Sequence, residues 1–391
     1  MKSNDNLATI RELMLEFAEI TGLFPAVSSP KRYLWTDAFG VCNFLELYRQ
    51  TGEDRYLDLA VALVEQVHAI LGRHRDDDER TGWISGLDEE AGKQHPTRGG
   101  LRIGKKMQER DPSEPYDEQQ EWDRDGQYYH YLTKWMHALS RLGRVTGERV
   151  YNQWAVELAQ TAHARFTYIS PPDGRKRMYW KMSIDLSRPL VTAMGQHDPL
   201  DGLITCYELQ VTAGGEEKSV CPDLQDEIRD LAGICRGLAW ETDDPLGIGG
   251  LLFDACRTVQ MIDHGFSQQA PPRPEELLKA ALTGLQTFVR TNTLNLPAAY
   301  RLAFRELGLT IGMHGVGMIH ALLEEKTGLG RKHPLLVEYI KMLLKYSPII
   351  DPIENFWLDP EQRSAASWRD HREINMVMLA TSLLPDGFLS L

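Results

Sequence analysis

The sequence Tyr-Arg-Gln-Thr-Gly-Glu-Asp-Arg-Tyr at residues 48–56 joins two runs in which apolar residues recur with helical spacing. Its central Thr-Gly-Glu is typical of a helix that ends at a glycine and is followed directly by a new helix. Residues 144–151 repeat this joint, and residues 325–329 contain a third Thr-Gly. Short joints of this kind make consecutive helices antiparallel, so the chain is predicted to consist of helical hairpins.

Helical periodicity recurs along the whole chain, and strong strand patterns are absent. Twelve helices are predicted, over residues 5–21, 36–51, 54–72, 125–146, 148–166, 199–212, 223–239, 246–263, 274–291, 301–327, 333–346 and 369–383. The odd-numbered helices carry one charged face, which is typical of outer helices, whereas the even-numbered ones are poorer in charge and richer in small residues. The alternation predicts an all-α fold, an (α/α)6 toroid of six inner and outer helix pairs.

The long connections all lead into the predicted inner helices. They cover residues 22–35, 73–124, 167–198, 240–245, 292–300 and 347–368. Since the inner helices would be parallel, their N-termini would share one rim with these loops, and sites are commonly built from such loops on a rigid scaffold. We therefore expect one (α/α)6 barrel domain over residues 1–391, with 73–124 as a long loop insertion that covers the rim.

The amino-acid composition of the chain limits the classes of molecule that it is expected to bind. The 391 residues have a net charge of −13, and the sequence lacks the Lys/Arg clusters that phosphate binding needs, so neither nucleic acid nor an anionic membrane is an expected partner. No segment reaches the roughly 20 apolar residues that span a bilayer, and the N-terminus is polar, so a cytoplasmic protein is expected. The composition does not indicate an oligomeric state.

Neither a metal nor a cofactor is expected. The five cysteines, including Cys221 in a predicted loop, form no CxxC pair, and most are expected to be buried free thiols. The sequence contains no HExxH and no Walker or dinucleotide-binding pattern. Lys105 and Lys106 follow a glycine-rich stretch that lacks the strand–loop–helix context of a phosphate loop, so this stretch is interpreted as a lid over the rim.

The predicted start of the second inner helix, at residues 117–130, holds an unusually large number of side chains that could bind a ligand or transfer a proton. It holds five carboxylates, an arginine, a histidine, a tryptophan and two tyrosines. Helix capping explains one or two of the acids, including Asp125, but not the whole set. We interpret the stretch as one wall of a polar ligand site, with Asp123 as a catalytic candidate. The residues expected to bind substrate here are Trp122, Asp125, Tyr129 and His130.

The other inner helices contribute further candidates near their predicted N-termini. The catalytic candidates are Asp37, His197, Asp201, His314 and His371, and the substrate-binding candidates are Trp35, Trp368 and Arg369. Asp37 also fits a helix cap, and a histidine in an apolar helix, such as His314, also fits a hydrogen-bonded core residue. Several tryptophans lie in or beside the long loops, which favours a saccharide ligand, although such tryptophans also serve to pack loops onto a scaffold.

The chain resembles the six-hairpin glycosidase-like superfamily in four places. These are Trp35-Thr36-Asp37, the Thr-Gly-Glu joints, the helix start at 123–130 and the helix start at 368–375. The resemblance implies an (α/α)6 toroid that acts on a small saccharide. Unsaturated glucuronyl hydrolases of this superfamily use aspartates at the rim as acid and base. The similar N-acylglucosamine 2-epimerases use two histidines on inner helices, which implies His314 and His371 here.

Three hypotheses of function follow. The first is a glycoside hydrolase, including the unsaturated uronyl type, in which Asp123 is the general acid because Trp122 would desolvate it, and Asp201 or Asp37 is the base. The alternative is a sugar epimerase or isomerase in which His314 and His371 exchange the proton. The second alternative is a toroid without catalytic activity that serves as a binding module.

Overall fold

The computed structural model describes residues 2–213, 223–266 and 273–391, and Cys221 lies outside this range. Its secondary structure is predominantly helical, so the predicted all-α class is confirmed. The chain divides into two compact units, which are described separately. The N-terminal unit comprises Ala18–Cys235, and the C-terminal unit comprises Arg236–Leu391 together with Met1–Phe17. That all of 1–391 forms one barrel domain stays a prediction.

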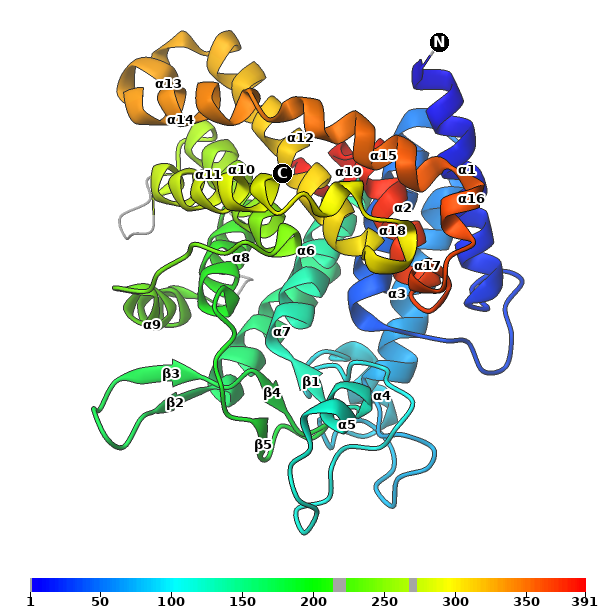
Figure 1. Cartoon of the computed structure of the whole chain (residues 1–391). Helices are drawn as coiled ribbons and strands as arrows, with labels where there is room; N and C mark the ends of the chain where they lie inside the picture. The colour runs from blue at the N-terminus through cyan, green and yellow to red at the C-terminus, as the bar shows by residue number, and fades with distance from the viewer. Residues whose placement is uncertain (1, 214–222, 267–272) are drawn as a thin grey trace. The chain divides into compact units, whose positions relative to one another are not determined.

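The N-terminal unit contains three pairs of consecutive long helices and a small amount of sheet (Figure 1). Its elements are α2 (Leu34–Thr51), α3 (Asp54–Leu71), α4 (Glu89–Gln94), α5 (Glu118–Asp123), β1 (Gln127–Tyr128), α6 (Tyr129–Thr146), α7 (Arg149–Phe166), β2 (Thr167–Ile169), β3 (Lys176–Met178), β4 (Lys181–Met182), β5 (Pro189–Val191), α8 (Asp198–Ala213) and α9 (Gln225–Cys235). The pairs are α2–α3, α6–α7 and α8–α9, as the sequence predicts.

The Thr-Gly-Glu joints have the geometry expected from their sequence. Gly52 and Gly147 adopt left-handed φ angles of 69° and 75°, which glycine reaches without the Cβ clash of other residues. The hydroxyl of Thr51 donates to the carbonyl of Leu47 and accepts the N–H of Glu53 at 3.1 Å, so it links the end of α2 to the start of α3. The second joint has the same pair of hydrogen bonds. The third copy was wrongly predicted, because Gly328 lies inside the short helix α13.

The three central helices of the N-terminal unit, α2, α6 and α8, lie in contact and run in the same direction. Hydrogen-bonded pairs between α6 and α8 advance together along both helices, from Thr133–Asp201 to His137–Glu208. α2 is buried from Leu34 to Leu47, as expected of an inner helix, whereas α3 is buried along one face only. The N-termini of the three inner helices therefore lie at one end of the unit.

The strands were not expected, and all are two or three residues long. β1, β4 and β5 form an antiparallel sheet in the order β1-β4-β5, and Gln127 pairs with Met182 in its register. β2 and β3 form a separate hairpin. Segments this short carry too little alternation to stand out in the sequence. The small sheet joins the start of α6 to the connection before α8, so it holds two of the long loops beside the inner-helix N-termini.

The C-terminal unit repeats the arrangement. Its elements are the first residues of α1 (Lys2–Ile20), α10 (Pro245–Asp263), α11 (Pro274–Arg290), η1 (Thr293–Asn295), η2 (Ala298–Tyr300), α12 (Ala303–Glu325), α13 (Thr327–Lys332), α14 (Pro334–Leu344), η3 (Ser347–Ile349), α15 (Ile350–Leu358), α16 (Pro360–Arg363), α17 (Ala366–Arg369), α18 (Arg372–Leu383) and α19 (Asp386–Leu389). The pairs α10–α11 and α12–α14 are in contact, and α18 is joined to α1 by the ion pair of Arg372 with Glu16.

The central helices of the C-terminal unit, α10, α12 and α18, are also parallel. Gly249 and Gly312 bring α10 and α12 so close that an added Cβ at Gly249 would lie 2.0 Å from the carbonyl oxygen of Gly308. This contact explains the small residues that marked these helices in the sequence. Between α12 and α18, Thr310 bonds Ser382 at 2.6 Å.

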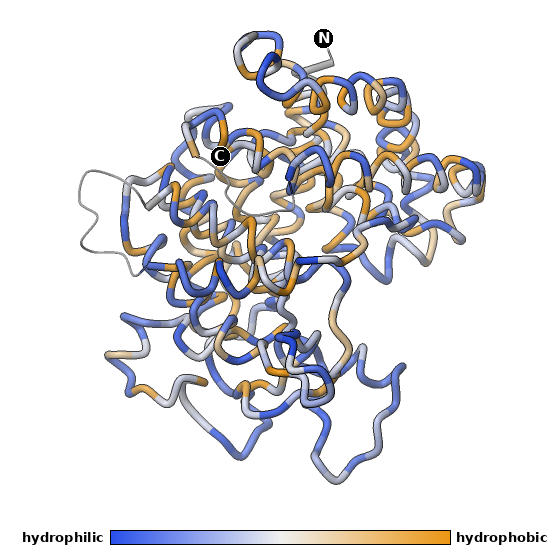
Figure 2. Tube along the Cα trace, turned by 90° about the vertical axis from the view of Figure 1, so that its left-hand side faces the viewer, coloured by the Kyte–Doolittle hydropathy of each residue, from blue (hydrophilic) through white to orange (hydrophobic). Residues whose placement is uncertain are grey.

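The hydropathy of the chain fits this packing, because hydrophobic residues recur along the helices (Figure 2). By length and hydropathy α12 could cross a membrane, but 67% of its most apolar window is buried inside the protein, as in a core helix.

Candidate functional site

The N-termini of α2, α6 and α8 meet through their side chains. The hydroxyl groups of Tyr33, at the start of α2, and Tyr131, in the first turn of α6, are 2.6 Å apart. Nδ1 of His130 at the start of α6 lies 3.7 Å from Oδ1 of Asp198, the first residue of α8. The end of the N-terminal unit where the inner helices begin therefore gathers polar side chains, and the helix dipoles favour negative charge there.

Aromatic rings form a continuous row at this end of the unit. The ring centroids of Trp35 and Tyr131 are 6.5 Å apart, and Tyr131 lies 5.2 Å from Tyr128. Tyr128 is 5.4 Å from Trp180, which packs edge-on against Trp122 at 5.0 Å. Trp35 is buried, whereas Trp122 is 47% exposed. The row therefore leads from the core to the surface and offers an aromatic face to a ligand.

His130 is held within this row. Its ring lies 4.8 Å from Tyr131 and 5.4 Å from Tyr128, and its side chain is 32% exposed. Nδ1 of His130 and Oδ2 of Asp198 are both buried without a hydrogen-bond partner. A buried polar atom without a partner is costly, so a small rotation that closes the 3.7 Å gap would be favourable. In that arrangement the Asp198 carboxylate would orient the imidazole, whose exposed edge is left for a ligand.

Two tyrosines beside His130 are hydrogen-bond donors. Burial raises the pKa of Tyr33 to about 12, although its hydrogen bond to Tyr131 acts in the opposite direction. Burial also raises the pKa of Tyr131 well above its usual value. Both phenols consequently stay protonated at neutral pH, and because one hydroxyl donates to the other, the pair keeps one O–H to donate to a ligand oxygen.

Lys105 adds a positive charge to the same cluster. Its ammonium nitrogen lies 5.3 Å from the ring centroid of Tyr33. Burial lowers the pKa of Lys105, while the charges of Asp123 and Asp125 act to raise it. The glycine-rich stretch that we interpreted as a lid therefore contributes a cation near the N-terminal ends of α2 and α6.

Asp201 lies one helical turn after Asp198 on α8. Its carboxylate accepts the hydroxyl of Thr133 and lies 2.6 Å from the ammonium group of Lys134, and its side chain is only 8% exposed. A carboxylate that is already neutralised and hydrogen-bonded is a poor general base. Asp201 therefore serves to fix α8 to α6 below His130.

Asp37 is also occupied by structural contacts. It is buried within α2, accepts the backbone N–H of Tyr33 at 2.9 Å and lies 3.5 Å from the guanidinium of Arg32. Burial raises the pKa of Asp37 to about 6, against the effect of Arg32. Its carboxylate stabilises the start of α2, although Tyr33 and not Asp37 is the N-cap residue.

Asp125 connects the long 73–124 segment to the start of α6. It is fully buried, and its oxygens lie 2.9 Å from Nη1 of Arg102 and 3.2 Å from Nη1 of Arg75 and accept the N–H of Gly104 at 2.9 Å. These bonds leave it without a surface for substrate. Asp123, in contrast, is exposed at the end of α5, so the desolvation that Trp122 was expected to provide is absent.

Two other candidates of the N-terminal unit differ in exposure. Tyr129 is 2% exposed, packs 5.4 Å from Phe166 and lies so close to Gly202 that an added Cβ there would meet its hydroxyl at 2.3 Å. It is therefore a packing residue between α6 and α8. His197 is half-buried immediately before Asp198, and its carbonyl accepts the N–H of Asp201.

The two histidines expected to act as a pair lie apart within the C-terminal unit. Nε2 of His314 is 2.9 Å from Oε1 of Glu354, which also accepts the hydroxyl of Ser382 at 2.6 Å. His371 instead packs against Phe304 at 5.5 Å, in the first turn of α12. His314 lies ten residues further along this helix, which corresponds to roughly 15 Å. The two histidines thus contact different parts of α12 and its neighbours, and that their imidazoles act as a pair stays a prediction.

The remaining candidates of the C-terminal unit form no site with them. Trp368 is 4% exposed and stacks on Trp357 with centroids 5.7 Å apart. Arg369 is exposed at the end of α17. Trp357 also donates to Glu306 at 2.8 Å, so this tryptophan pair closes the loop onto the scaffold. Among the described residues, no group of three or more His, Cys, Asp or Glu side chains could hold a metal ion.

The structure therefore brings together Trp35, Trp122 and His130 of the sequence candidates. It adds Tyr33, Tyr131 and Trp180, which sequence reasoning missed or assigned to no role, as well as Lys105 and Asp198. Asp198 is the first residue of α8, and only its partner on α6 distinguishes it from an ordinary acid at a helix start. The tyrosines had a signal, since Tyr33 stands just before one predicted inner helix and Tyr131 lies in the second turn of another.

No known family model matches the chain, and no curated protein matches it either. Three solved structures are similar to it at low identity. A sugar epimerase from a ruminal bacterium has 12% identity and a TM-score of 0.43, with 81% of this chain and 75% of that chain covered. A D-mannose isomerase has 14% identity and a TM-score of 0.47, with 86% and 85% covered. Cellobiose 2-epimerase from Spirochaeta thermophila DSM 6192 has 13% identity and a TM-score of 0.46, with 95% and 97% covered. At these scores the likeness does not assign an activity to this chain.

Proposed function

We propose that this chain is a carbohydrate-active enzyme that moves a proton at the carbon beside the carbonyl group of an aldose, as an isomerase or epimerase. One observation carries the proposal. A partly exposed imidazole, His130, lies against a buried and unbonded carboxylate, Asp198, within a row of aromatic rings. An imidazole that a carboxylate orients is the commonest proton-transfer group of enzymes.

The surroundings of His130 support a sugar rather than a purely apolar ligand. The exposed face of Trp122, with Trp180 beside it and the buried ring of Tyr128 behind it, offers an apolar surface to the C–H face of a sugar ring. The hydroxyls of Tyr33 and Tyr131 and the ammonium of Lys105 offer donors to its oxygens. A few donors beside an apolar wall are typical of small-molecule sites.

In the proposed reaction the open-chain sugar places its C2–H bond against the exposed edge of His130. The imidazole takes the C2 proton, and the electrons of that bond form the enediolate. The remaining O–H of the Tyr33–Tyr131 pair and the ammonium group of Lys105 stabilise the negative charge that develops on the carbonyl oxygen. Asp198 stabilises the imidazolium.

The proton is then returned in one of two ways. Return by His130 to C1 gives the ketose. Return to the other face of C2 gives the epimer and requires a second acid. We propose His197 for this role, because it immediately precedes Asp198 and is half-buried.

Hydrolysis, our first hypothesis from the sequence, is less well supported. It requires a protonated carboxyl group and a second carboxylate that can activate water. Asp37 and Asp201 are each paired with a cation, and Asp123 is exposed. The choice of Asp123 as acid and of Asp201 or Asp37 as base therefore has little support. Proton transfer agrees better with the side chains at the N-terminal ends of the inner helices.

Deuterium exchange at C2 tests the proposal. The purified protein is incubated in D2O with a panel of aldoses and reducing disaccharides, and loss of the C2 proton signal is followed by NMR. We expect exchange by the wild type, a loss of about 10²–10⁴-fold in His130→Gln, as for removal of a general base, and a smaller loss in Asp198→Asn. His320→Gln is the matched control, because His320 is half-exposed on α12 and pairs only with Glu324.

Two results would contradict the assignment. Unchanged exchange in His130→Gln would show that this imidazole is not the base, and loss of exchange in His371→Gln alone would move the chemistry to the C-terminal unit. Release of unsaturated uronic acid from oligosaccharides, without any exchange, would return the hydrolase hypothesis to first place.

A further inference from the structure

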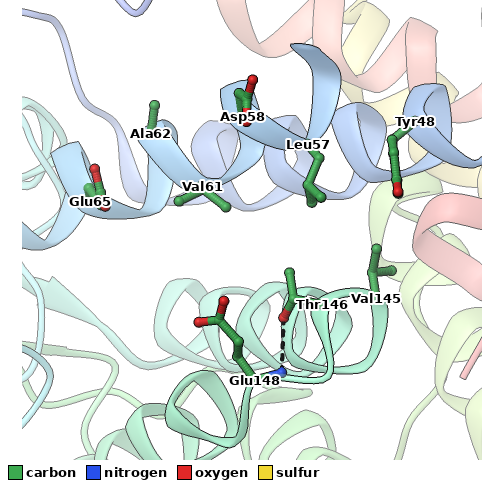
Figure 3. Close-up of a pocket in the computed structure, with 9 residues that line it drawn as sticks. All are labelled: Tyr48, Leu57, Asp58, Val61, Ala62, Glu65, Val145, Thr146 and Glu148. Atoms are coloured by element: carbon green, nitrogen blue, oxygen red, sulfur yellow. Dashed lines mark hydrogen bonds between the residues drawn. The ribbon is translucent and has the colours of Figure 1, made fainter. Parts of the chain in front are cut away.

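A groove lies at the opposite ends of the same helices, away from the aromatic row. It is about 450 Å³ in volume and runs between α3 and the joint of α6 with α7 (Figure 3). Its lining residues are Tyr48, Leu57, Asp58, Val61, Ala62, Glu65, Val145, Thr146 and Glu148. Five of them follow one face of α3 over more than two turns, so the groove is elongated along that helix.

The groove combines an apolar floor with negative charge. Leu57 and Val61 point from α3 toward the α6–α7 joint, where Val145 is 38% exposed. The carboxylates are Asp58, Glu65 and Glu148, and in the described part of the chain none of the three forms an ion pair. Burial and then the charges of Glu148 and Glu65 raise the pKa of Tyr151, which places both carboxylates near one phenol. An occupant of this groove would therefore be elongated, partly apolar and cationic.

The outward face of α14 has the complementary character. Leu335 is 55% exposed and Met342 is 37% exposed, and they lie seven residues apart on one side of the helix. Lys341 and Lys345 follow on the same helix or directly after it, Arg331 and Lys332 lie on α13 just before it, and the exposed Glu338 stands between Leu335 and Met342; in the described ranges none of these five forms an ion pair. Four cations against one carboxylate give this surface a net positive charge in a chain of net charge −13.

We propose that α14 of one copy of this chain docks in the α3 groove of a second copy. Leu335 and Met342 are separated by about 10.5 Å along α14, and Asp58 and Glu65 are separated by the same distance along α3. Helices that pack side by side lie 8–10 Å apart, so Leu335 and Met342 reach the groove at two points about 10.5 Å apart, with Leu57 and Val61 between them. The lysines then meet the carboxylates of the groove.

The contact joins two different surfaces, so each copy carries both a donor helix and an acceptor groove. Exposed ion pairs contribute about 0.2–1 kcal/mol each, so the association is expected to be weak and to decrease with salt. The active-site assignment above is independent of this proposal, because the groove lies at the C-terminal ends of α2 and α6.

Complementary charge reversal tests the contact. Sedimentation velocity is measured over a concentration series for the wild type, for a groove variant (Glu65→Lys with Glu148→Lys) and for a helix variant (Lys341→Glu with Lys345→Glu). Glu90→Lys on α4 and Lys279→Glu on α11 are matched controls, since both side chains are exposed and lie outside the two surfaces. Circular dichroism verifies that each variant is folded.

We expect the wild type to self-associate, each double variant to self-associate at least about tenfold more weakly, and an equimolar mixture of the two variants to recover the association. Recovery requires that the two reversed surfaces meet, which loss of folding cannot imitate. A wild type that remains monomeric throughout the concentration series would overturn the proposal. Self-association that both double variants retain, or that the mixture does not recover, would overturn it as well.

Discussion

The core of the N-terminal unit contains a histidine that we expect to make folding dependent on pH. His68 on α3 is 4% exposed, and its Nε2 accepts a hydrogen bond from the indole of Trp135 at 3.1 Å. Its ring also packs edge-on against Trp154 at 5.0 Å. Burial lowers the pKa of His68 to about 3, because this apolar cage disfavours the imidazolium. The folded protein therefore keeps His68 neutral under conditions where the unfolded chain takes up a proton.

The sign and size of the effect follow from linkage. Below the ordinary pKa of about 6.5, the unfolded state binds one proton more than the folded state, so stability falls as the pH falls from about 6.5 toward 3. The loss is about 1.4 kcal/mol per pH unit within this window. Between pH 7 and pH 4.5 it amounts to about 2.5 kcal/mol of the free energy of unfolding. Above pH 7 the contribution no longer changes.

The variant His68→Gln isolates this contribution, because the glutamine carbonyl can still accept from Trp135 but does not titrate. Urea unfolding is followed by tryptophan fluorescence for both proteins at pH 7 and pH 4.5. All other groups titrate equally in the two proteins, so the variant should lose about 2.5 kcal/mol less than the wild type on acidification. If the difference between the two proteins changes by less than about 0.5 kcal/mol between these pH values, His68 is not buried in its neutral form and the reasoning fails.

Three further outcomes are expected. Trp122→Ala should raise KM about five- to tenfold for any aldose that shows exchange, with little change in kcat, because the indole offers a binding face and no proton; steady-state kinetics will show whether kcat falls instead. Lys181→Met should cost about 3–5 kcal/mol in urea unfolding, because Lys181 is fully buried and its ammonium bonds the carboxylate of Glu121 at 2.9 Å, which would lose this cation. Gly52→Ala should lower the free energy of unfolding by about 1–2 kcal/mol, because φ at this position is 69°. The added Cβ would meet no atom of the described residues within 4 Å, so only backbone strain is added. An unchanged urea midpoint would argue against this geometry of the joint.

The helices could be predicted from the sequence because their determinants are local. The Thr-Gly-Glu joint contains both the glycine that ends α2 and the hydroxyl that links it to α3, and the observed bounds of most long helices lie within a few residues of the predicted ones. The start of α6 was less accurate, because Gln127 and Tyr128 pair with β4 and leave α6 to begin at Tyr129. That pairing depends on Lys181 and Met182, more than fifty residues away, which no local pattern reveals.

The site was harder to predict because the same residue types have structural roles at some positions and catalytic roles at others. Asp37, Asp125 and Asp201 have the positions expected of rim acids, but each lies beside an arginine or lysine, and the cations of Asp125 and Asp201 come from distant segments. Asp198, which the sequence did not single out, faces His130 of α6 from the start of α8. Which acid is free to act depends on partners distant in sequence, and the sequence shows only where along a helix each acid stands.

The same dependence on distant partners explains why, within residues 117–130, His130 keeps its expected role as a ligand-binding residue while Asp125 and Tyr129 do not. Five successive positions, from Asp125 to Tyr129, are buried, and Asp125 and Tyr129 are fully used in packing. The chain then turns into α6, and successive side chains of a helix point in directions about 100° apart. His130 follows Tyr129 and faces both the aromatic row and Asp198 of α8, and its side chain retains an exposed edge. The β1–β4 pairing ends at Tyr128 and fixes the start of α6 at Tyr129, so it sets the direction of His130 and is as important for the proposed chemistry as Asp198 itself.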